Sequence, residues 1–338
     1  MKINFAFFLL VVAITISHSQ TLKYENLIFE GAGLRGIAYS GVLSELEKYN
    51  LIKDIVKVGG TSAGAATALM VSLGYNSKEI FDIISETRFQ KFNDGEFMFI
   101  GGFTRLNSKY GWYKGEEFSK WLDKIIDSKT GDAEITFGEL KKRKFKQLFV
   151  TATCMNKQKL LVFSADTYPE MKVKDAVRIS MSIPLYFEAV FIDSVGHVYN
   201  EKNNSGNLDV VVDGGIIGNY PIFIFDSLQV DSLNNQIRIP NYKTLGIRID
   251  SELQIKNDEL SKELVSIPIS NMSDYLEAFY ILILEKLNRT QLIQEDWERT
   301  ISVSSVGIGP RIKKLSTEQK KSLIKSGELS AKKFLNKE

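Results

Sequence analysis

The stretch that most constrains the fold runs from Val56 to Gly74 and reads VKVGGTSAGAATALMVSLG. β-Branched residues lead into the pentapeptide GTSAG (60–64), and small and apolar residues follow it at helical spacing. This order predicts a strand, a tight turn and a helix, with Ser62 at the apex of the turn. The flanking glycines would allow a strained turn that lifts the hydroxyl clear of the sheet. The stretch therefore predicts a nucleophilic serine, and the alternative is a glycine-rich turn with an idle hydroxyl.

A second glycine-rich turn comes earlier in the chain. Tyr24 to Glu30 alternates like a strand and runs into GAGLRG (31–36), which a predicted helix follows. Such a turn can bind a dinucleotide, but this requires an acidic side chain at the end of the second strand, where the serine turn lies instead. The alternative is that the backbone N–H groups of Gly33, Leu34 and Arg35 form an anion-binding nest. A nest of this kind would stabilise the oxyanion of an ester under attack.

The N-terminus has the features of a secretory signal peptide. Lys2 precedes an apolar run from Phe5 to Ile16, and small residues stand at the −3 and −1 positions of a cleavage site after Ser19. We therefore expect residues 1–19 to be removed and the protein to be exported to the periplasm, the cell surface or the medium. The run is too short to span a bilayer comfortably. An uncleaved amphipathic anchor is the alternative.

Few residues could act as the base for Ser62, because the chain has only two histidines. His18 falls in the predicted signal peptide. His197 lies in a polar loop, and its position along the chain fits neither the α/β-hydrolase nor the chymotrypsin order, although a triad with an acid between it and Ser62 stays open. Asp213 is the better candidate, because it ends a predicted strand (208–212) and two glycines follow it. At the C-terminal edge of a sheet its carboxylate would lie where open α/β sheets place their sites.

Composition narrows the possible partners. The formal net charge of +2 at pH 7 argues against a nucleic-acid partner, and 338 residues with 44% hydrophobic content can bury a large core. Cys154 is the only cysteine, so no intramolecular disulfide is possible, and its strand-like surroundings predict a buried thiol. After residue 19 no apolar run reaches membrane-spanning length. We expect no transmembrane segment in the mature chain, and membrane contact only from the surface.

The three motifs GAGLRG (31–36), GTSAG (60–64) and DGG (213–215), in this order, resemble the oxyanion loop, nucleophile elbow and catalytic aspartate motif of the patatin-like phospholipase family. Similarity continues through residues 175–187 and 315–335. The resemblance implies a three-layer α/β/α sandwich with a central, mainly parallel sheet. Residues 24–226 would form the catalytic domain, and residues 227–338 would add strands and helices that complete the same domain.

The resemblance also implies a mechanism. Ser62 would be the nucleophile and Asp213 the base of a dyad without histidine, and the amides of Gly33, Leu34 and Arg35 would form the oxyanion hole. The motif glycines are Gly31, Gly36, Gly60, Gly64, Gly214 and Gly215. The implied reaction is hydrolysis of phospholipid or other lipid esters through an acyl-enzyme, without a metal or cofactor. Two alternatives remain: a soluble carboxylesterase that uses His197, and a non-catalytic lipid-binding protein that keeps the fold.

Three further segments carry expectations of their own. Residues 88–112 are rich in phenylalanine without a helix or strand period, and would form either a mobile cap that touches lipid or a plug of the core. Residues 227–240 are polar and are predicted to be a loop or an insertion. Residues 316–335 predict an amphipathic helix that opens with a capping box of Ser316 and Gln319.

Overall fold

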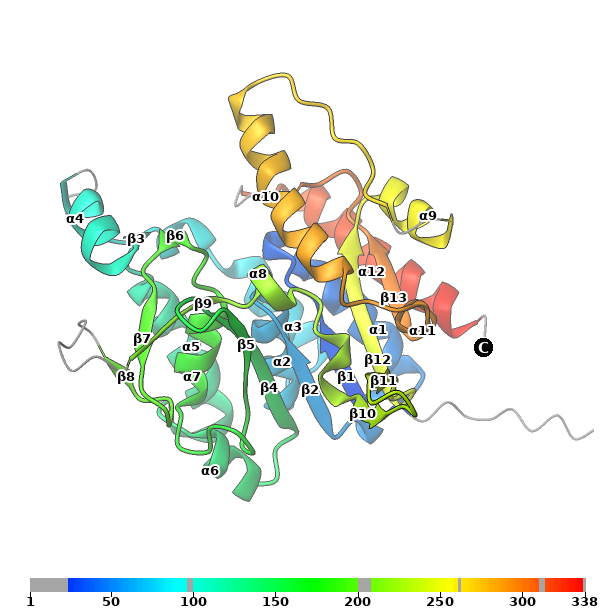
Figure 1. Cartoon of the computed structure of the whole chain (residues 1–338), viewed down its shortest axis with the longest axis horizontal. Helices are drawn as coiled ribbons and strands as arrows, with labels where there is room; N and C mark the ends of the chain where they lie inside the picture. The colour runs from blue at the N-terminus through cyan, green and yellow to red at the C-terminus, as the bar shows by residue number, and fades with distance from the viewer. Residues whose placement is uncertain (1–23, 96–99, 200–207, 261–262, 310–313, 337–338) are drawn as a thin grey trace, which may run out of the picture.

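The computed structural model describes residues 24–95, 100–199, 208–260, 263–309 and 314–336. Within these ranges the centre is a nine-stranded sheet in the order β13-β12-β1-β2-β4-β9-β7-β8, with β5 paired to β4 (Figure 1). The parallel strands are β1 (Asn26–Phe29), β2 (Lys57–Gly60), β4 (Gln147–Cys154), β12 (Thr244–Asp250) and β13 (Thr300–Ser304). The antiparallel strands are β5 (Lys159–Phe163), β7 (Val190–Ile192), β8 (Val198–Tyr199) and β9 (Asp209–Asp213). The predicted signal peptide, residues 1–19, lies outside the described residues.

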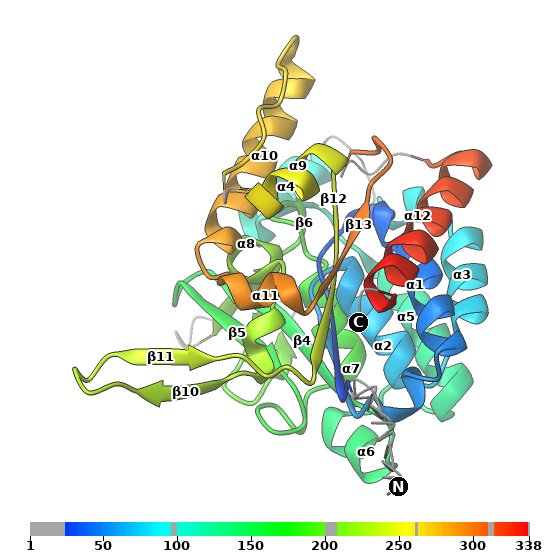
Figure 2. The same cartoon turned by 90° about the vertical axis from the view of Figure 1, so that its right-hand side faces the viewer.

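Helices cover both faces of the sheet, which is therefore the middle of three layers (Figure 2). On one side of the sheet lie α1 (Ala38–Lys48), α2 (Ala63–Ser72), α3 (Ser77–Glu86), α5 (Glu116–Thr130), α7 (Val173–Ser180) and α12 (Thr317–Leu335). The opposite face carries α8 (Gly215–Gly218), α10 (Met272–Arg289) and α11 (Gln294–Glu298). The predicted α/β/α sandwich is confirmed, and its sheet is mixed because antiparallel strands extend the parallel half.

The strand β1 illustrates why a central strand of such a sheet contains consecutive apolar residues. Leu27 and Phe29 belong to the large core beneath α1 and α2, whereas Ile28 packs with Tyr220 and Ile222 on the other face. Side chains alternate across a strand, so a strand between two layers of helices needs apolar residues at every position.

The C-terminal part of the chain joins the same sheet. β12 pairs with β1 and β13 pairs with β12, both in parallel. The final helix α12 begins as expected: the Ser316 hydroxyl accepts from the N–H of Gln319 at 3.2 Å, and the Gln319 side chain accepts from the N–H of Ser316 at 2.9 Å. This capping box satisfies backbone donors that the first helical turn leaves unpaired.

The segment 227–240, predicted to be a loop or an insertion, has regular structure. The segment forms a hairpin of β10 (Ser227–Val230) and β11 (Gln236–Ile239), which projects from the body of the protein (Figure 2). Its polar middle is the turn, where the Asp231 carboxylate accepts from the N–H groups of Leu233 and Asn235 at 2.9 and 2.7 Å. The polar residues of the turn made the alternating apolar residues of the two short strands hard to recognise in the sequence.

The aromatic segment 88–112 is also more regular than expected. It contains the 3₁₀ helix η3 (Phe89–Phe92), α4 (Ile100–Lys109) and the start of β3 (Gly111–Tyr113), which pairs with β6 (Leu185–Phe187). Phe92 is buried, with its ring centroid 5.1 Å from that of Phe118. Phe103 is exposed on α4, so the segment both fills the core and presents an apolar surface. Residues 96–99 lie outside the described residues.

Membrane-spanning helices were sought throughout the described part of the chain. None of its helices combines the length and the apolar character that crossing a bilayer requires.

Candidate active site

Ser62 occupies the apex between β2 and α2, as the sequence predicts. Its backbone has φ 53° and ψ −123°, a region that residues with a Cβ rarely adopt. The flanking glycines make this turn possible. A Cβ on Gly64 would lie 2.4 Å from the carbonyl oxygen of Phe29, and one on Gly60 would lie 2.6 Å from the carbonyl carbon of Gly64. The close approach of helix and strand thus requires glycine at both positions.

Two hydroxyl contacts that the sequence did not suggest hold the turn in place. The backbone N–H of Ser62 donates to the hydroxyl of Ser180, at the end of α7, at 2.8 Å. The hydroxyl of Thr61 donates to the carbonyl of Gly218 at 2.6 Å. Both partners are more than 100 residues away along the chain, so only the folded sheet brings them to the turn.

Asp213 ends β9 and its carboxyl group is buried. Oδ1 accepts from the N–H of Gly215 at 2.7 Å, whereas Oδ2 has no hydrogen bond of ordinary geometry to any described residue. Burial raises the pKa of Asp213 from 3.8 to about 7, although the Gly215 N–H and the nearby Ser62 hydroxyl both lower it. One carboxylate oxygen therefore stays available beside the serine.

The register of the sheet explains how these two residues meet. Gly60, at the end of β2, is paired with Val150 of β4, and Asp213 is paired with Ala152 of the same strand. We expected Asp213 to end a strand of the parallel part of the sheet. Instead, β9 runs antiparallel to β4. It arrives from the opposite direction and ends beside the same part of β4.

The loop at residues 31–36 contributes backbone donors. Gly33 has φ 54° and begins the 3₁₀ helix η1 (Gly33–Ile37). Among the described residues, the N–H groups of Gly33 and Leu34 have no hydrogen-bond acceptor, whereas the N–H and the Nε of Arg35 both donate to the carbonyl of Ala32 at 3.2 Å. The Arg35 side chain thus braces the loop, and two of the three predicted donors are free to bind an anion.

Asn219 ties this loop to the segment after Asp213. The N–H of Gly31 donates to the carbonyl of Asn219 at 2.9 Å, and the side-chain amide of Asn219 donates to the carbonyl of Gly31 at 3.1 Å. The sequence alone identifies Gly31 only as a motif glycine. A Cβ at Gly31 would lie 2.2 Å from the Asn219 side chain, so the glycine makes this close contact possible.

Ser62, Asp213 and the loop 31–36 all line one cavity of about 500 Å³. Much of its wall is apolar and comes from helices on the α2 side of the sheet. The apolar lining includes Met70, Ile84, Phe89, Phe92, Phe118 and Trp121. The cavity thus joins a nucleophile and a carboxylate to a space suited to a hydrocarbon chain.

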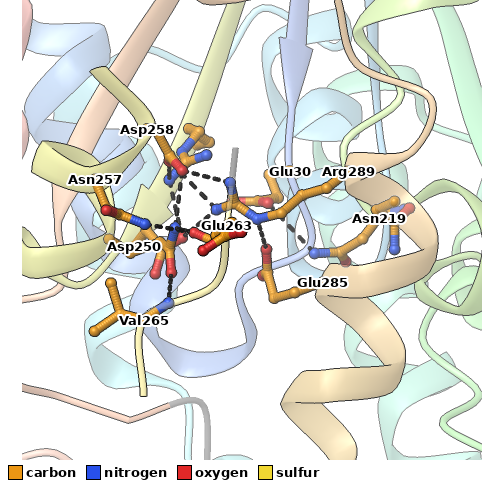
Figure 3. Close-up of polar contacts among 12 residues, drawn as sticks. Glu30, Asn219, Asp250, Asn257, Asp258, Glu263, Val265, Glu285 and Arg289 are labelled. Atoms are coloured by element: carbon orange, nitrogen blue, oxygen red, sulfur yellow. Dashed lines mark hydrogen bonds and ion pairs between the residues drawn. The ribbon is translucent and has the colours of Figure 1, made fainter. Parts of the chain in front are cut away.

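Charged residues form another part of the wall, where Glu285 and Asp250 line the cavity. Figure 3 shows the polar contacts of these two residues. Arg289 donates to Glu285 at 3.2 Å and to Asp250 at 3.3 Å. Glu30 is buried behind them and accepts from the N–H of Ile249 at 2.9 Å. Burial and the negative charge of Glu285 raise the pKa of Glu30 to about 8. The sequence did not identify this network, because its residues come from three separate segments, at the ends of β1 and β12 and in α10.

His197 lies apart from this arrangement. Its side chain is 55% exposed, its Nδ1 lies 3.1 Å from Oδ2 of Asp193, and it is not among the residues that line the cavity. Cys154 is buried in β4, as predicted. Within the described ranges no three acidic, histidine or cysteine side chains are grouped so that they could hold a metal ion.

Comparisons with known proteins bear on the family and the fold of the chain. The family model described as patatin-like phospholipase matches residues 27–226. An uncharacterized protein of Acanthamoeba polyphaga mimivirus is 28% identical over 320 residues, which cover 94% of each chain. A probable lipid hydrolase of invertebrate iridescent virus 6 is 27% identical over 208 residues, covering 60% of this chain and 63% of the viral one. The crystal structure of VipD from Legionella pneumophila has the same fold, with a TM-score of 0.55 at 16% identity over 93% of this chain and 67% of that chain.

Proposed function

Since this chain belongs to the patatin-like phospholipase family, we propose that it hydrolyses carboxylic esters of lipids with Ser62 as nucleophile and Asp213 as general base. The observation that carries the proposal is the convergence of both side chains on one cavity, with a free carboxylate oxygen beside the serine. The family and the viral lipid hydrolase relative support lipid hydrolysis as the reaction. The type of activity we propose is that of a phospholipase A or lysophospholipase.

The reaction would proceed through an acyl-enzyme. Asp213 takes the proton of the Ser62 hydroxyl as the oxygen attacks the ester carbonyl. The negative charge that develops on the carbonyl oxygen is stabilised by the N–H groups of Gly33 and Leu34, each worth about 3 kcal/mol in comparable oxyanion holes. The proton then passes to the leaving alcohol, and water attacks the acyl-serine to release the fatty acid. A base with a pKa of about 7 is well matched to proton transfer at neutral pH.

The apolar wall supports a lipid as the substrate. Side chains such as Met70, Phe89 and Trp121 would bury the acyl chain, and each buried CH₂ group contributes about 0.8 kcal/mol. No step of this reaction requires a metal or an organic cofactor. We also propose contact with the surface of a membrane or lipid aggregate, because that is where such a substrate is found.

The direct test uses the purified protein, a fluorophosphonate probe and a mixture of lipids. The probe should label Ser62 in the folded protein, and mass spectrometry should detect free fatty acid with wild type but not with Ser62→Ala. Labelling at another residue would contradict the assigned nucleophile. A folded protein that binds lipids but is neither labelled nor active would favour the non-catalytic alternative.

Export is a separate proposal that rests on residues 1–19, which the structure does not describe. The apolar run from Phe5 to Ile16 supports it. N-terminal sequencing of protein collected from outside the cytoplasm should begin at Gln20. Recovery of the protein only from the cytoplasm, with its first residues intact, would contradict it.

A further inference from the structure

We propose that α10 docks the protein on a lipid surface through an apolar stripe, defined as Met272, Tyr275, Phe279 and Leu282. These side chains are 72, 54, 54 and 53% exposed. Their spacing of three or four residues places them on one face of the helix. The inference rests on the proposed function, because an enzyme that hydrolyses lipids has to meet its substrate at such a surface.

A different face of the same helix belongs to the active site. Ile281 and Glu285 line the cavity. The side-chain amide of Asn288 donates to the carbonyl of Gly215 at 3.0 Å, and its carbonyl oxygen accepts from the N–H of Asn219 at 2.5 Å. The helix that carries the apolar stripe thus also contributes to the wall of the cavity and contacts the segment that follows Asp213.

The C-terminal end of α10 is fixed by ion pairs (Figure 3). Arg289 bonds to Asp258 of α9 (Glu252–Leu260), to Asp250 at the end of β12 and to Glu285 of its own helix. The N-terminal end projects beyond the sheet in both views (Figures 1 and 2). Since one end is anchored in the active site, the exposed stripe holds a defined orientation toward the cavity.

Other exposed apolar residues lie at the same end of the molecule. Leu185, at the start of β6, is 68% exposed, and its neighbours Ile183 and Tyr186 line the cavity. Phe103 of α4 is 65% exposed. In both views α4, β6 and the free end of α10 lie toward the same end of the sheet (Figures 1 and 2). Exposed apolar side chains on the elements that also line the cavity fit a lipid assembly, because apolar area that enters an interface is removed from water.

The hairpin β10–β11 offers a matched control. Leu228 and Val230 are 65 and 63% exposed, so they resemble the stripe in chemistry and exposure. The hairpin projects in another direction, and none of its residues lines the cavity (Figure 2). Substitutions there remove a similar exposed apolar area without affecting the proposed docking surface.

The test measures partitioning onto phosphatidylcholine–phosphatidylglycerol vesicles, in the mature chain carrying Ser62→Ala so that the lipids stay intact. The double substitution Tyr275→Ser and Phe279→Ser should lower the partition coefficient about tenfold or more, because both side chains lose apolar area that would enter the interface. The double substitution Leu228→Ser and Val230→Ser should leave it unchanged. Melting temperatures should match in all three proteins, and Met272→Ser with Leu282→Ser provides a second pair if the first does not fold.

Three outcomes would overturn the docking proposal. They are absence of vesicle binding by the parent protein, equal partitioning of the stripe and hairpin variants, and a stripe substitution that converts a dimer to a monomer without changing partitioning. Failure of the proposed function gives a different result: with Ser62 present, no fatty acid is released although the stripe still controls binding. With both proposals correct, the stripe variant loses activity on vesicles and keeps it on a soluble short-chain ester.

Discussion

Ser62 and Asp213 reach the same cavity from the C-terminal ends of two strands, β2 and β9, that run in opposite directions along β4. The ends meet because Gly60 is paired with Val150 and Asp213 with Ala152. A buried carboxylate with one free oxygen therefore lies beside a serine whose own backbone is strained. Several measurable consequences follow from this pairing.

The first prediction concerns the pH dependence of the rate. The proposed base, Asp213, can take a proton only when it is deprotonated, and burial raises its pKa to about 7. We therefore expect kcat/KM to rise with pH up to about 7, with a tenfold change per pH unit below that value, and then to level off. Asp213→Asn should lower kcat by about 10³-fold or more. Initial rates on a soluble ester check both, and a rate that stays constant between about pH 5 and 8 would contradict the assigned base.

The buried carboxyl group of Asp213 should also lower the free energy of unfolding at neutral pH. Its pKa is 3.8 when unfolded and about 7 when folded, so the unfolded state loses its proton first as the pH rises. The cost is absent below about pH 4, grows up to about pH 7 and then amounts to roughly 4 kcal/mol, at about 1.4 kcal/mol per pKa unit. Asp213→Asn should accordingly be more stable than wild type at pH 8 and about equal to it near pH 4. Urea unfolding at both pH values measures the difference in stability between the variant and wild type. An equal difference at both pH values would contradict the raised pKa of Asp213.

Backbone strain at Ser62 gives the next prediction. Ser62→Gly and Ser62→Ala should both be inactive, but the glycine variant should be more stable by about 1 kcal/mol, because φ 53° strains any residue with a Cβ. Ser44, inside α1, is the control. There the glycine variant should be less stable than the alanine variant by about 1 kcal/mol. The same order at both positions, measured by thermal unfolding, would show that the turn is not strained.

The local features of the site could be predicted from the sequence. The elbow around Ser62 and the loop at Gly33 are each specified by a strand, glycines and a helix that follow one another, and a short window contains all of these. Asp213 could be identified as a strand-ending carboxylate, and its place beside Ser62 followed from the family resemblance.

Features that depend on distant contacts could not be predicted. The direction of β9 is set by its pairing with β4, more than 50 residues earlier, and no local pattern separates a parallel from an antiparallel buried strand. The hydroxyl of Ser180 on the Ser62 N–H and the carboxyl of Glu285 in the cavity wall are single side chains on helices, and their role appears only once the helices are packed. The hairpin at 227–240 was missed because its turn residues outnumber the apolar ones that mark its strands.

A further prediction separates the dyad from a histidine-dependent esterase. His197 is exposed, paired with Asp193 and absent from the cavity lining, so His197→Ala should keep kcat/KM within about twofold of wild type. Steady-state kinetics on a soluble ester provide the measurement. A loss of several orders of magnitude, in a variant with an unchanged melting temperature, would favour the esterase.

The last prediction concerns Asn288, which joins α10 to the segment after Asp213. Its side chain bonds to the carbonyl of Gly215 and to the N–H of Asn219, and Asn219 in turn holds Gly31 at the start of the loop 31–36. Asn288→Ala would leave a buried carbonyl and a buried N–H without partners, at a cost of about 1–3 kcal/mol in unfolding free energy. We expect kcat to fall about tenfold while the pH midpoint set by Asp213 stays unchanged, because the substitution displaces the loops without altering the base.

Asn288→Asp refines this prediction, since it places a buried carboxylate oxygen against the carbonyl of Gly215. Its unfolding free energy and its kcat should both lie below those of Asn288→Ala. The remote substitution Asn336→Ala removes an exposed side-chain amide that accepts from Tyr49 at 2.9 Å, and it should change neither rate nor stability measurably. If Asn288→Ala keeps the full kcat while its unfolding free energy falls, the residue supports only the fold, and the catalytic loops hold their positions without it.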